Sequence, residues 1–160
     1  DCVGSWSEGR SVEIRSPEAT RPWQHVLEPL SGYLNLGQAL CNDKNLNGEG
    51  LNFGPRAEQN RTVVELLQDL SEYWHFKNVS DAFTVTDNIP FHEAALLKLN
   101  CDKSLALLEW HAALDYRDTI KFTSEWYYDY YKKDSDMMSK TISQINEYQN
   151  TAYEKRLSWA

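Results

Sequence analysis

The sequence predicts an α+β fold made mostly of helices with a few short strands. Several long stretches carry apolar residues at helical spacing. The alternating stretches are too few and too short for a complete doubly wound parallel sheet. At 160 residues the chain is long enough for one domain with a real hydrophobic core.

The first helix is expected over residues 1–8, with Trp6 on its apolar face and Gly9 as its stop. No cap residue precedes this helix, so we expect a fragment of a longer protein. No signal peptide is visible. Residues 11–15 alternate in the manner of a short strand. Residues 21–26 are expected to be extended, because a proline inside them disfavours helix at the preceding residue.

A helix is expected from Glu28, followed by a turn over residues 42–50, where an Asn-Gly pair interrupts regular structure. Residues 51–55 are expected to form a short strand that ends in a Gly-Pro breaker. Thr62 is expected to cap the next helix, with Glu65 as its reciprocal partner. The apolar stripe of the helix from Glu28 is Leu30, Tyr33, Leu34, Gly37, Leu40 and Cys41, and that of the helix capped by Thr62 is Val63, Leu66, Leu67, Leu70 and Trp74.

The second half is expected to be mainly helical. Residues 82–86 and 96–99 are expected to be two short extended runs. Asp102 is expected to cap a short helix over residues 103–109. Two longer helices close the chain, an aromatic one over residues 116–133 and a polar one over residues 137–153.

Composition and charge exclude several classes of protein. Hydrophobic residues make up 41% of the chain and charged residues 25%, as in globular proteins. The net charge of −8 argues against a nucleic-acid binder, and no apolar run reaches the ~18 residues of a membrane span. Three separated cysteines form neither a disulfide framework nor a zinc motif and suit a reducing compartment. We therefore expect a cytoplasmic protein without a metal site, a nucleic-acid partner or a membrane partner.

A candidate anion site lies near the start of the chain. Arg15 and Arg21 bracket a turn beside Trp23 and His25. Guanidinium forks suit phosphate oxygens, so the cluster is a candidate pocket for a diphosphate. Alternatively, both arginines are surface groups that pair with neighbouring glutamates. His25 is either an orienting donor, a ligand or a base in this cluster, or a structural histidine.

Two further polar groups are candidates for ligand contacts. Asn52 carries an amide that could contact a base or ribose edge, or could satisfy neighbouring backbone. His92 beside Glu93 could perform acid–base chemistry, contact a ligand from a loop, or be structural. The aromatic run over residues 126–131 is either a sugar-stacking surface or packing. The sequence contains no Gly-rich phosphate turn and no self-contained catalytic set.

The stretch over residues 21–33 reads Arg-Pro-Trp-Gln-His-Val-Leu-Glu-Pro-Leu-Ser-Gly-Tyr. It resembles the most distinctive segment of the CDP-glucose 4,6-dehydratases, which belong to the extended short-chain dehydrogenase/reductase superfamily. The resemblance extends over residues 1 to about 150. Further segments resemble that family in the same order, namely residues 51–55, 92–94, 97–100, 101–110, 125–127 and 137–148.

The resemblance implies a fragment of an α/β enzyme. Residues 1–150 would be its C-terminal nucleotide-sugar-binding portion and residues 151–160 a tail, while an NAD-binding Rossmann domain lies outside this chain. The whole enzyme would be a homo-oligomer that uses NAD to convert CDP-glucose to CDP-4-keto-6-deoxyglucose and water, toward the deoxysugars of O-antigen lipopolysaccharide. This chain would be inactive alone, with no catalytic or cofactor-binding residue of its own.

The same resemblance implies roles for individual residues. Arg21 matches an arginine that holds the substrate diphosphate in related nucleotide-sugar enzymes, and Asn52 matches an asparagine near that ligand. Where those relatives have a second arginine, this chain has Ile89. The expected substrate-binding residues are Arg21, Arg15, Asn52, His92, Trp23 and His25.

Two other functions remain compatible with the residues. One is a different nucleotide-sugar dehydratase or epimerase of the same superfamily. The other is a free-standing, non-catalytic binding module that docks a partner through its aromatic residues.

Overall fold

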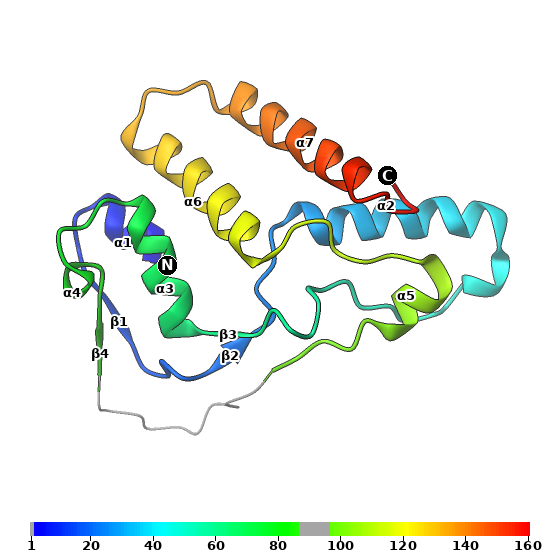
Figure 1. Cartoon of the computed structure of the whole chain (residues 1–160), viewed down its shortest axis with the longest axis horizontal. Coiled ribbons are helices and arrows are strands. Elements are labelled where there is room, and N and C mark those ends of the chain that lie inside the picture. The colour runs from blue at the N-terminus through cyan, green and yellow to red at the C-terminus, as the bar shows by residue number, and fades with distance from the viewer. Residues whose placement is uncertain (1, 87–96) are drawn as a thin grey trace.

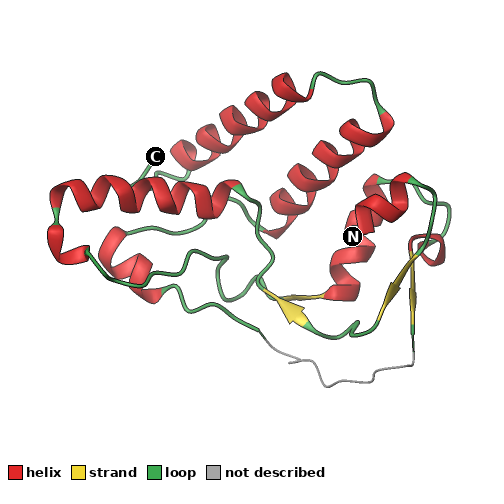
Figure 2. Cartoon of the chain, turned by 180° about the vertical axis from the view of Figure 1, so that it is seen from behind, coloured by secondary structure: helices red, strands yellow, loops and turns green. Residues whose placement is uncertain are grey.

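The computed structural model describes residues 2–86 and 97–160, and helices dominate it (Figures 1 and 2). The predicted fold class, mostly helical α+β with a few short strands, is confirmed. Within the described ranges, no helix has both the length and the apolar character needed to cross a membrane. The elements are α1 (Cys2–Ser7), β1 (Val12–Ile14), β2 (Thr20–Arg21), α2 (Leu27–Asn42), the 3₁₀ turn η1 (Lys44–Leu46), β3 (Arg61–Thr62), α3 (Val63–Tyr73), α4 (Val79–Ala82), β4 (Phe83–Val85), α5 (Asp102–Leu108), α6 (Tyr116–Lys132) and α7 (Met137–Glu154).

The first core forms around the parallel pair of β1 and β4, in which Val12 lies opposite Phe83. Trp6 of α1 is buried here against α3 and α6, and its Nε1 donates a hydrogen bond to the carbonyl oxygen of Ala82 at 2.7 Å. Leu67 of α3 completes the buried set at the centre. The apolar face of α1 with Trp6 and the expected apolar stripe of α3 therefore both face this core.

The second core joins α2, α6 and α7. Figure 1 shows α6 and α7 as an antiparallel pair, with the C-terminal end of α7 beside α2. Glu28 of α2 is almost fully buried and accepts hydrogen bonds from the backbone nitrogens of Ala113 at 3.1 Å and Leu114 at 2.6 Å. Tyr148 of α7 donates to the same carboxylate at 3.0 Å. This carboxylate therefore holds the start of α2, the segment before α6 and α7 together.

Close packing requires glycine at two positions, Gly32 and Gly54, which lie in the segments over residues 21–33 and 51–55. A Cβ on Gly32 would lie 2.3 Å from a ring carbon of Phe53, and the Phe53 ring packs edge-on against Trp110 with the centroids 4.9 Å apart. A Cβ on Gly54 would lie 2.9 Å from a methyl carbon of Leu99. Both positions therefore admit only glycine without a shift of their neighbours.

The long helices lie where the periodicity predicts them. The reciprocal cap of α3 is also confirmed, because Thr62 N–H donates to Glu65 Oε2 at 2.7 Å and Glu65 N–H donates to Thr62 Oγ1 at 3.2 Å. The first strand ends at Ile14, so Arg15 follows it in a bend. In the extended stretch over residues 21–26, only Arg21 belongs to a strand.

Two expected strands are wrong. Residues 51–55 are irregular, because their carbonyls bond to side chains and not to a neighbouring strand: Phe53 O accepts from Gln24 Nε2 at 3.1 Å, and Asn52 O accepts from Ser104 Oγ. Residues 97–99 are irregular too, and residue 96 lies outside the described residues. In the first stretch the apolar residue Phe53 is buried, whereas in the second Leu97 is exposed and Leu99 is half-buried.

The expected cap of α5 is wrong by one residue. Asp102 is the first residue of that helix and its N–H donates to Asn100 Oδ1 at 2.9 Å, so Cys101 occupies the cap position. The sequence analysis also missed β3 and α4, which have two and four residues and are too short for a periodic signal.

The last ten residues pack onto the second core. Leu157 is buried, and Trp159 stacks on Tyr148 with the ring centroids 5.8 Å apart. The Trp159 Nε1 donates to the carbonyl oxygen of His111 at 3.1 Å.

Candidate functional site

Two arginines lie directly opposite each other on the antiparallel ribbon of β2 and β3. Arg21 pairs with Arg61, and Thr20 pairs with Thr62. Side chains of directly opposite residues share one face of an antiparallel pair, and like charges placed there repel each other. The Nη1 of Arg21, which is half-buried, donates to the carbonyl oxygen of Thr20 at 2.8 Å. This ribbon therefore places two arginines next to each other on paired strands.

Arg61 rests on an aromatic ring. Its guanidinium carbon lies 5.3 Å from the ring centroid of Tyr116, whose hydroxyl donates to Asp69 Oδ2 at 2.8 Å. Burial, reinforced by the hydrogen bond to Asp69, raises the pKa of Tyr116 well above its usual range. Tyr116 therefore stays neutral at physiological pH and supports the Arg61 guanidinium by a cation–π contact.

Trp23 and Gln24 fix the segment that follows Arg21. The Trp23 Nε1 donates to the carbonyl oxygen of Arg61 at 3.0 Å, so this indole ties the two strands of the ribbon together. The Gln24 amide donates to the carbonyl oxygen of Phe53, while its Oε1 is buried without a hydrogen-bond partner among the described residues. In the expected cluster around Arg21, the Trp23 side chain therefore stabilises the ribbon, and the Gln24 Oε1 is left as an acceptor without a donor among the described residues.

His25 is buried and lines a cavity of about 400 Å³ between the start of α2, α6 and α7. Its ring packs edge-on against Phe122, with the centroids 5.5 Å apart. Its Nδ1 accepts a long hydrogen bond of 3.4 Å from Leu27 N–H. Burial lowers the pKa of His25, so the imidazole is neutral near pH 7 and carries its proton on Nε2. Trp126 and Tyr127 form the aromatic wall of the same cavity.

The side-chain amide of Asn52 is hydrogen-bonded to the backbone. Its Nδ2 donates to the carbonyl oxygen of Asn100 at 3.0 Å, which matches the structural alternative and holds the irregular segment beside α5. A neighbouring cavity of about 820 Å³ is lined by Arg56 and Lys98 among others. The sequence analysis did not single out either of these cations.

The remaining expected site residues are dispersed or outside the described residues. Arg15 is exposed just after β1, which belongs to a different sheet from the ribbon of Arg21. His92 and Ile89 lie outside the described residues. In the described part of the chain, His, Cys, Asp and Glu side chains form no group of three that could hold a metal ion.

Comparison with known proteins gives one clear relationship. No protein-family model matches the chain. Over 150 residues it is 36% identical to the CDP-glucose 4,6-dehydratase of Salmonella typhimurium. The chain resembles a CDP-glucose 4,6-dehydratase. The match covers 92% of this chain but only 40% of that dehydratase, and it corresponds to the C-terminal portion of the relative.

The comparison confirms the resemblance expected from residues 21–33. Arg61 was missed because β3, which places it opposite Arg21, is only two residues long. A sequence signal does exist for it: Arg61 directly precedes the capping threonine of α3, where an exposed arginine at a helix N-terminus opposes the helix dipole. An arginine in that position needs a reason other than helix stability.

Proposed function

We propose that this chain is the nucleotide-sugar-binding portion of a CDP-glucose 4,6-dehydratase and that Arg21 contacts the substrate diphosphate. The observation that carries the proposal is the 36% identity over 92% of the chain to the Salmonella enzyme. The full enzyme would convert CDP-glucose to CDP-4-keto-6-deoxyglucose and water in the synthesis of deoxysugars for O-antigen. Residues 1–150 would form the nucleotide-sugar-binding portion and residues 151–160 its tail.

The ribbon of Arg21 and Arg61 supports a diphosphate contact. Two guanidinium groups on one face repel each other, and a bridging anion replaces that repulsion with attraction to both. A diphosphate carries one negative charge on each phosphate and presents several oxygens to planar donor forks. Arg61 would thus supply the second guanidinium that Ile89 cannot. Arg15, Asn52 and His92 are proposed as substrate contacts on the resemblance alone, because Arg15 follows a strand of another sheet and the Asn52 amide donates to backbone.

His25 would orient a ring of the substrate. Its neutral imidazole has a donor at Nε2, and its cavity has the aromatic wall of Trp126 and Tyr127. A ring with polar substituents, such as a sugar or a pyrimidine, would find both an apolar face and a hydrogen-bond donor there. Trp23 would act indirectly, because its indole is bonded to the backbone of Arg61 and fixes the ribbon.

NAD does not fit the residues described here. Gly48 and Gly50 follow η1 and precede an irregular segment, so they do not form the strand–turn–helix that holds a dinucleotide pyrophosphate. NAD would be bound by the N-terminal portion of the full enzyme, and the hydride chemistry would take place there. This chain would contribute binding energy remote from the reacting carbons, which orients the sugar for reaction.

The experiment that tests the proposal supplies NAD and CDP-glucose to the full-length enzyme that carries this chain. We expect a 4-keto-6-deoxy sugar nucleotide as product, and no product when the 160-residue chain is supplied alone. Absence of product from the full-length enzyme would refute the proposal. A competition panel with CDP, dTDP, UDP and GDP identifies the base. Preference for a nucleotide other than CDP would assign the chain to another dehydratase or epimerase of the superfamily.

A further inference from the structure

Arg56 and Lys98 are two cations that the proposed function leaves unused, and they line the same cavity of about 820 Å³. Arg56 lies in the irregular segment that leads into β3, and Lys98 lies in the irregular segment that leads into α5. These two segments run side by side (Figures 1 and 2), because the Asn52 amide of the first donates to the carbonyl oxygen of Asn100 in the second at 3.0 Å. The fold therefore brings together two cations that are distant in the sequence.

Neither cation is neutralised by the part of the chain that the structure describes. Both side chains are exposed, and neither forms an ion pair or a side-chain hydrogen bond with a described residue. Lys103 on α5 shows the contrast, because its ammonium pairs with Glu49. The chain carries 24 acidic and 16 basic residues, so carboxylate partners are plentiful. The charges of Arg56 and Lys98 are therefore available to an anionic ligand.

A narrow crevice places this pair beside the ribbon of β2 and β3. Arg56 and Lys98 line the crevice on one side, and Pro22 and Asn60 line it on the other. Pro22 and Asn60 are the sequence neighbours of the two ribbon arginines. No carboxylate is among the described residues that line the crevice. The two unpaired cations and the two ribbon arginines therefore border one region without an intervening acid.

The larger cavity differs in charge from the crevice. Two carboxylates, those of Glu58 and Asp102, line it together with the apolar side chains of Leu99 and Leu105. Like charges repel an anion, so a negatively charged group is favoured at the crevice end, where the carboxylates are absent. A ligand that carries its charge at the crevice and an uncharged group in the cavity fits both environments.

We propose that Arg56 and Lys98 contact the phosphate groups of the nucleotide-sugar, as further substrate-binding residues beside Arg21. This inference rests on the proposed function, and the resemblance to the dehydratases assigns neither residue a role. A guanidinium presents a planar fork to phosphate oxygens, and an ammonium binds them as a point charge. Because neither cation has an ion pair to break, the contact forms without losing an existing one. The uncharged part of the ligand next to the diphosphate would enter the larger cavity.

The experiment measures the Kd for CDP in the full-length enzyme. CDP carries the diphosphate but no sugar, so it cannot be dehydrated during the measurement. Arg56→Met and Lys98→Met remove each charge and keep an unbranched side chain at an exposed position. Lys77→Met, between α3 and α4 and outside both cavities, removes the same charge and is the matched control. We expect the first two variants to raise the Kd by about tenfold each and the control to leave it within about twofold.

A further variant separates the charge of Lys98 from its packing. Lys98→Arg keeps a positive charge on a long side chain, so we expect it to retain the wild-type Kd within about threefold. The unfolding free energy should be the same in all these variants, because the replaced side chains are exposed. An Arg variant as weak as the Met variant would show that the charge of Lys98 does not bind the phosphate.

Three further results would overturn the inference. A wild-type Kd for Arg56→Met or Lys98→Met would remove that residue from the site. An equal loss of affinity in Lys77→Met would show an effect of net charge alone. Failure of the wild-type enzyme to bind CDP would refute the proposed function as well. In contrast, an enzyme that binds CDP through both cations but yields no 4-keto sugar from CDP-glucose would refute the proposed function alone.

Discussion

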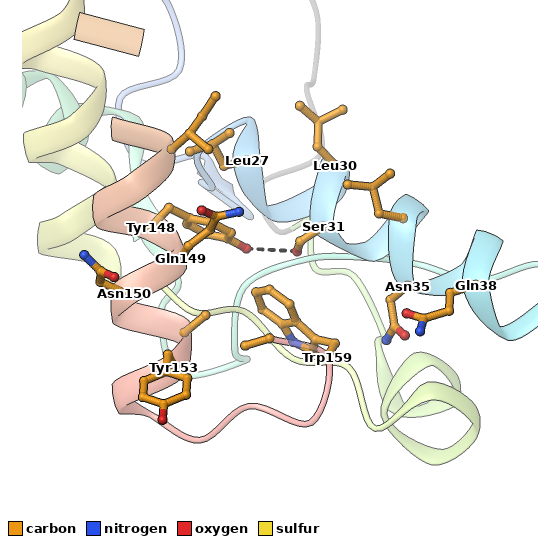
Figure 3. Close-up of a pocket in the computed structure, with 14 residues that line it drawn as sticks. Leu27, Leu30, Ser31, Asn35, Gln38, Tyr148, Gln149, Asn150, Tyr153 and Trp159 are labelled. Atoms are coloured by element: carbon orange, nitrogen blue, oxygen red, sulfur yellow. Dashed lines mark hydrogen bonds between the residues drawn. The ribbon is translucent and has the colours of Figure 1, made fainter. Parts of the chain in front are cut away.

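The hydroxyl of Tyr148 donates a hydrogen bond of 3.0 Å to the carboxylate of Glu28, across 120 positions of the chain. The same carboxylate binds two backbone N–H groups of the segment before α6. A second contact, from the Tyr148 hydroxyl to Ser31 Oγ at 2.9 Å, runs beside it (Figure 3). A single buried acid near the start of α2 thus determines how the three longest helices meet.

We predict that Glu28→Ala destabilises the chain by about 3 kcal/mol or more, because it leaves two buried N–H groups without an acceptor. Tyr148→Phe should cost about 1 kcal/mol, since it removes a hydroxyl and leaves both N–H bonds intact. The exposed Glu72→Ala is the matched control and should change stability by less than about 0.5 kcal/mol. Urea unfolding of the three variants measures these differences. Equal stabilities for Glu28→Ala and Glu72→Ala would contradict the role of Glu28.

We predict that the ionisation of Glu28 contributes to the pH dependence of the unfolding free energy. Burial raises its pKa, although the N–H groups of Leu114 and Ala113, the Tyr148 hydroxyl and the charge of Lys155 act in the opposite direction. The folded state therefore holds this proton more tightly than the unfolded state does. As pH rises above the ordinary glutamate pKa of about 4.3, the contribution of Glu28 to stability falls until the raised pKa is passed.

The isosteric Glu28→Gln tests this sign. The unfolding free energy of the wild type minus that of the variant should decrease as pH rises from about 4 toward neutrality. Carboxylates with lowered pKa values, such as Asp129 beside Lys133 and Lys140, are present in both proteins and cancel in the difference. A difference that increases with pH over this range would mean that the pKa of Glu28 is lowered in the folded state.

The two glycines of α2 should respond oppositely to the same substitution. Gly32→Ala forces a methyl group to within 2.3 Å of the Phe53 ring and should cost about 1–3 kcal/mol. Gly37→Ala meets open space in a helix interior and should stabilise the isolated chain by about 0.5–1 kcal/mol. Thermal unfolding of both variants measures the contrast. If both variants lost similar amounts of stability, the close approach of Gly32 to the Phe53 ring would not account for the loss at Gly32.

Most of the secondary structure could be predicted from the sequence, because the helices are long enough for periodicity to appear and Thr62 and Glu65 form a recognisable cap. The orientation of α2 could not be predicted. Its apolar stripe predicts burial, yet Leu30, Tyr33 and Leu34 are exposed in the structure, while Glu28 is buried by partners more than eighty positions away. Local sequence does not reveal such a long-range contact.

The candidate site could be predicted only in part. Arg21 was singled out by its neighbours, whereas the pairing of Arg61 with Arg21 depends on a two-residue strand that is too short for a periodic signal. The amide of Asn52 donates to the backbone carbonyl of Asn100. The residue type alone does not tell whether an asparagine binds backbone or a ligand. The strand expected over residues 51–55 failed because side chains of Gln24 and Ser104 satisfy its carbonyls from distant segments.

We propose that Arg21 and Arg61 hold the substrate diphosphate. The KM for CDP-glucose in the full-length enzyme tests this with Arg21→Ala, Arg61→Ala and the control Arg10→Ala. Arg10 is exposed and pairs with Glu8, which directly follows α1. Loss of a charge-assisted contact of about 1.5–3 kcal/mol should raise KM by roughly 10- to 150-fold for Arg21→Ala, with a smaller change in kcat. Arg61→Ala should act in the same direction, and Arg10→Ala should leave KM unchanged. A KM for Arg21→Ala equal to that of the wild type would show that Arg21 does not bind the diphosphate.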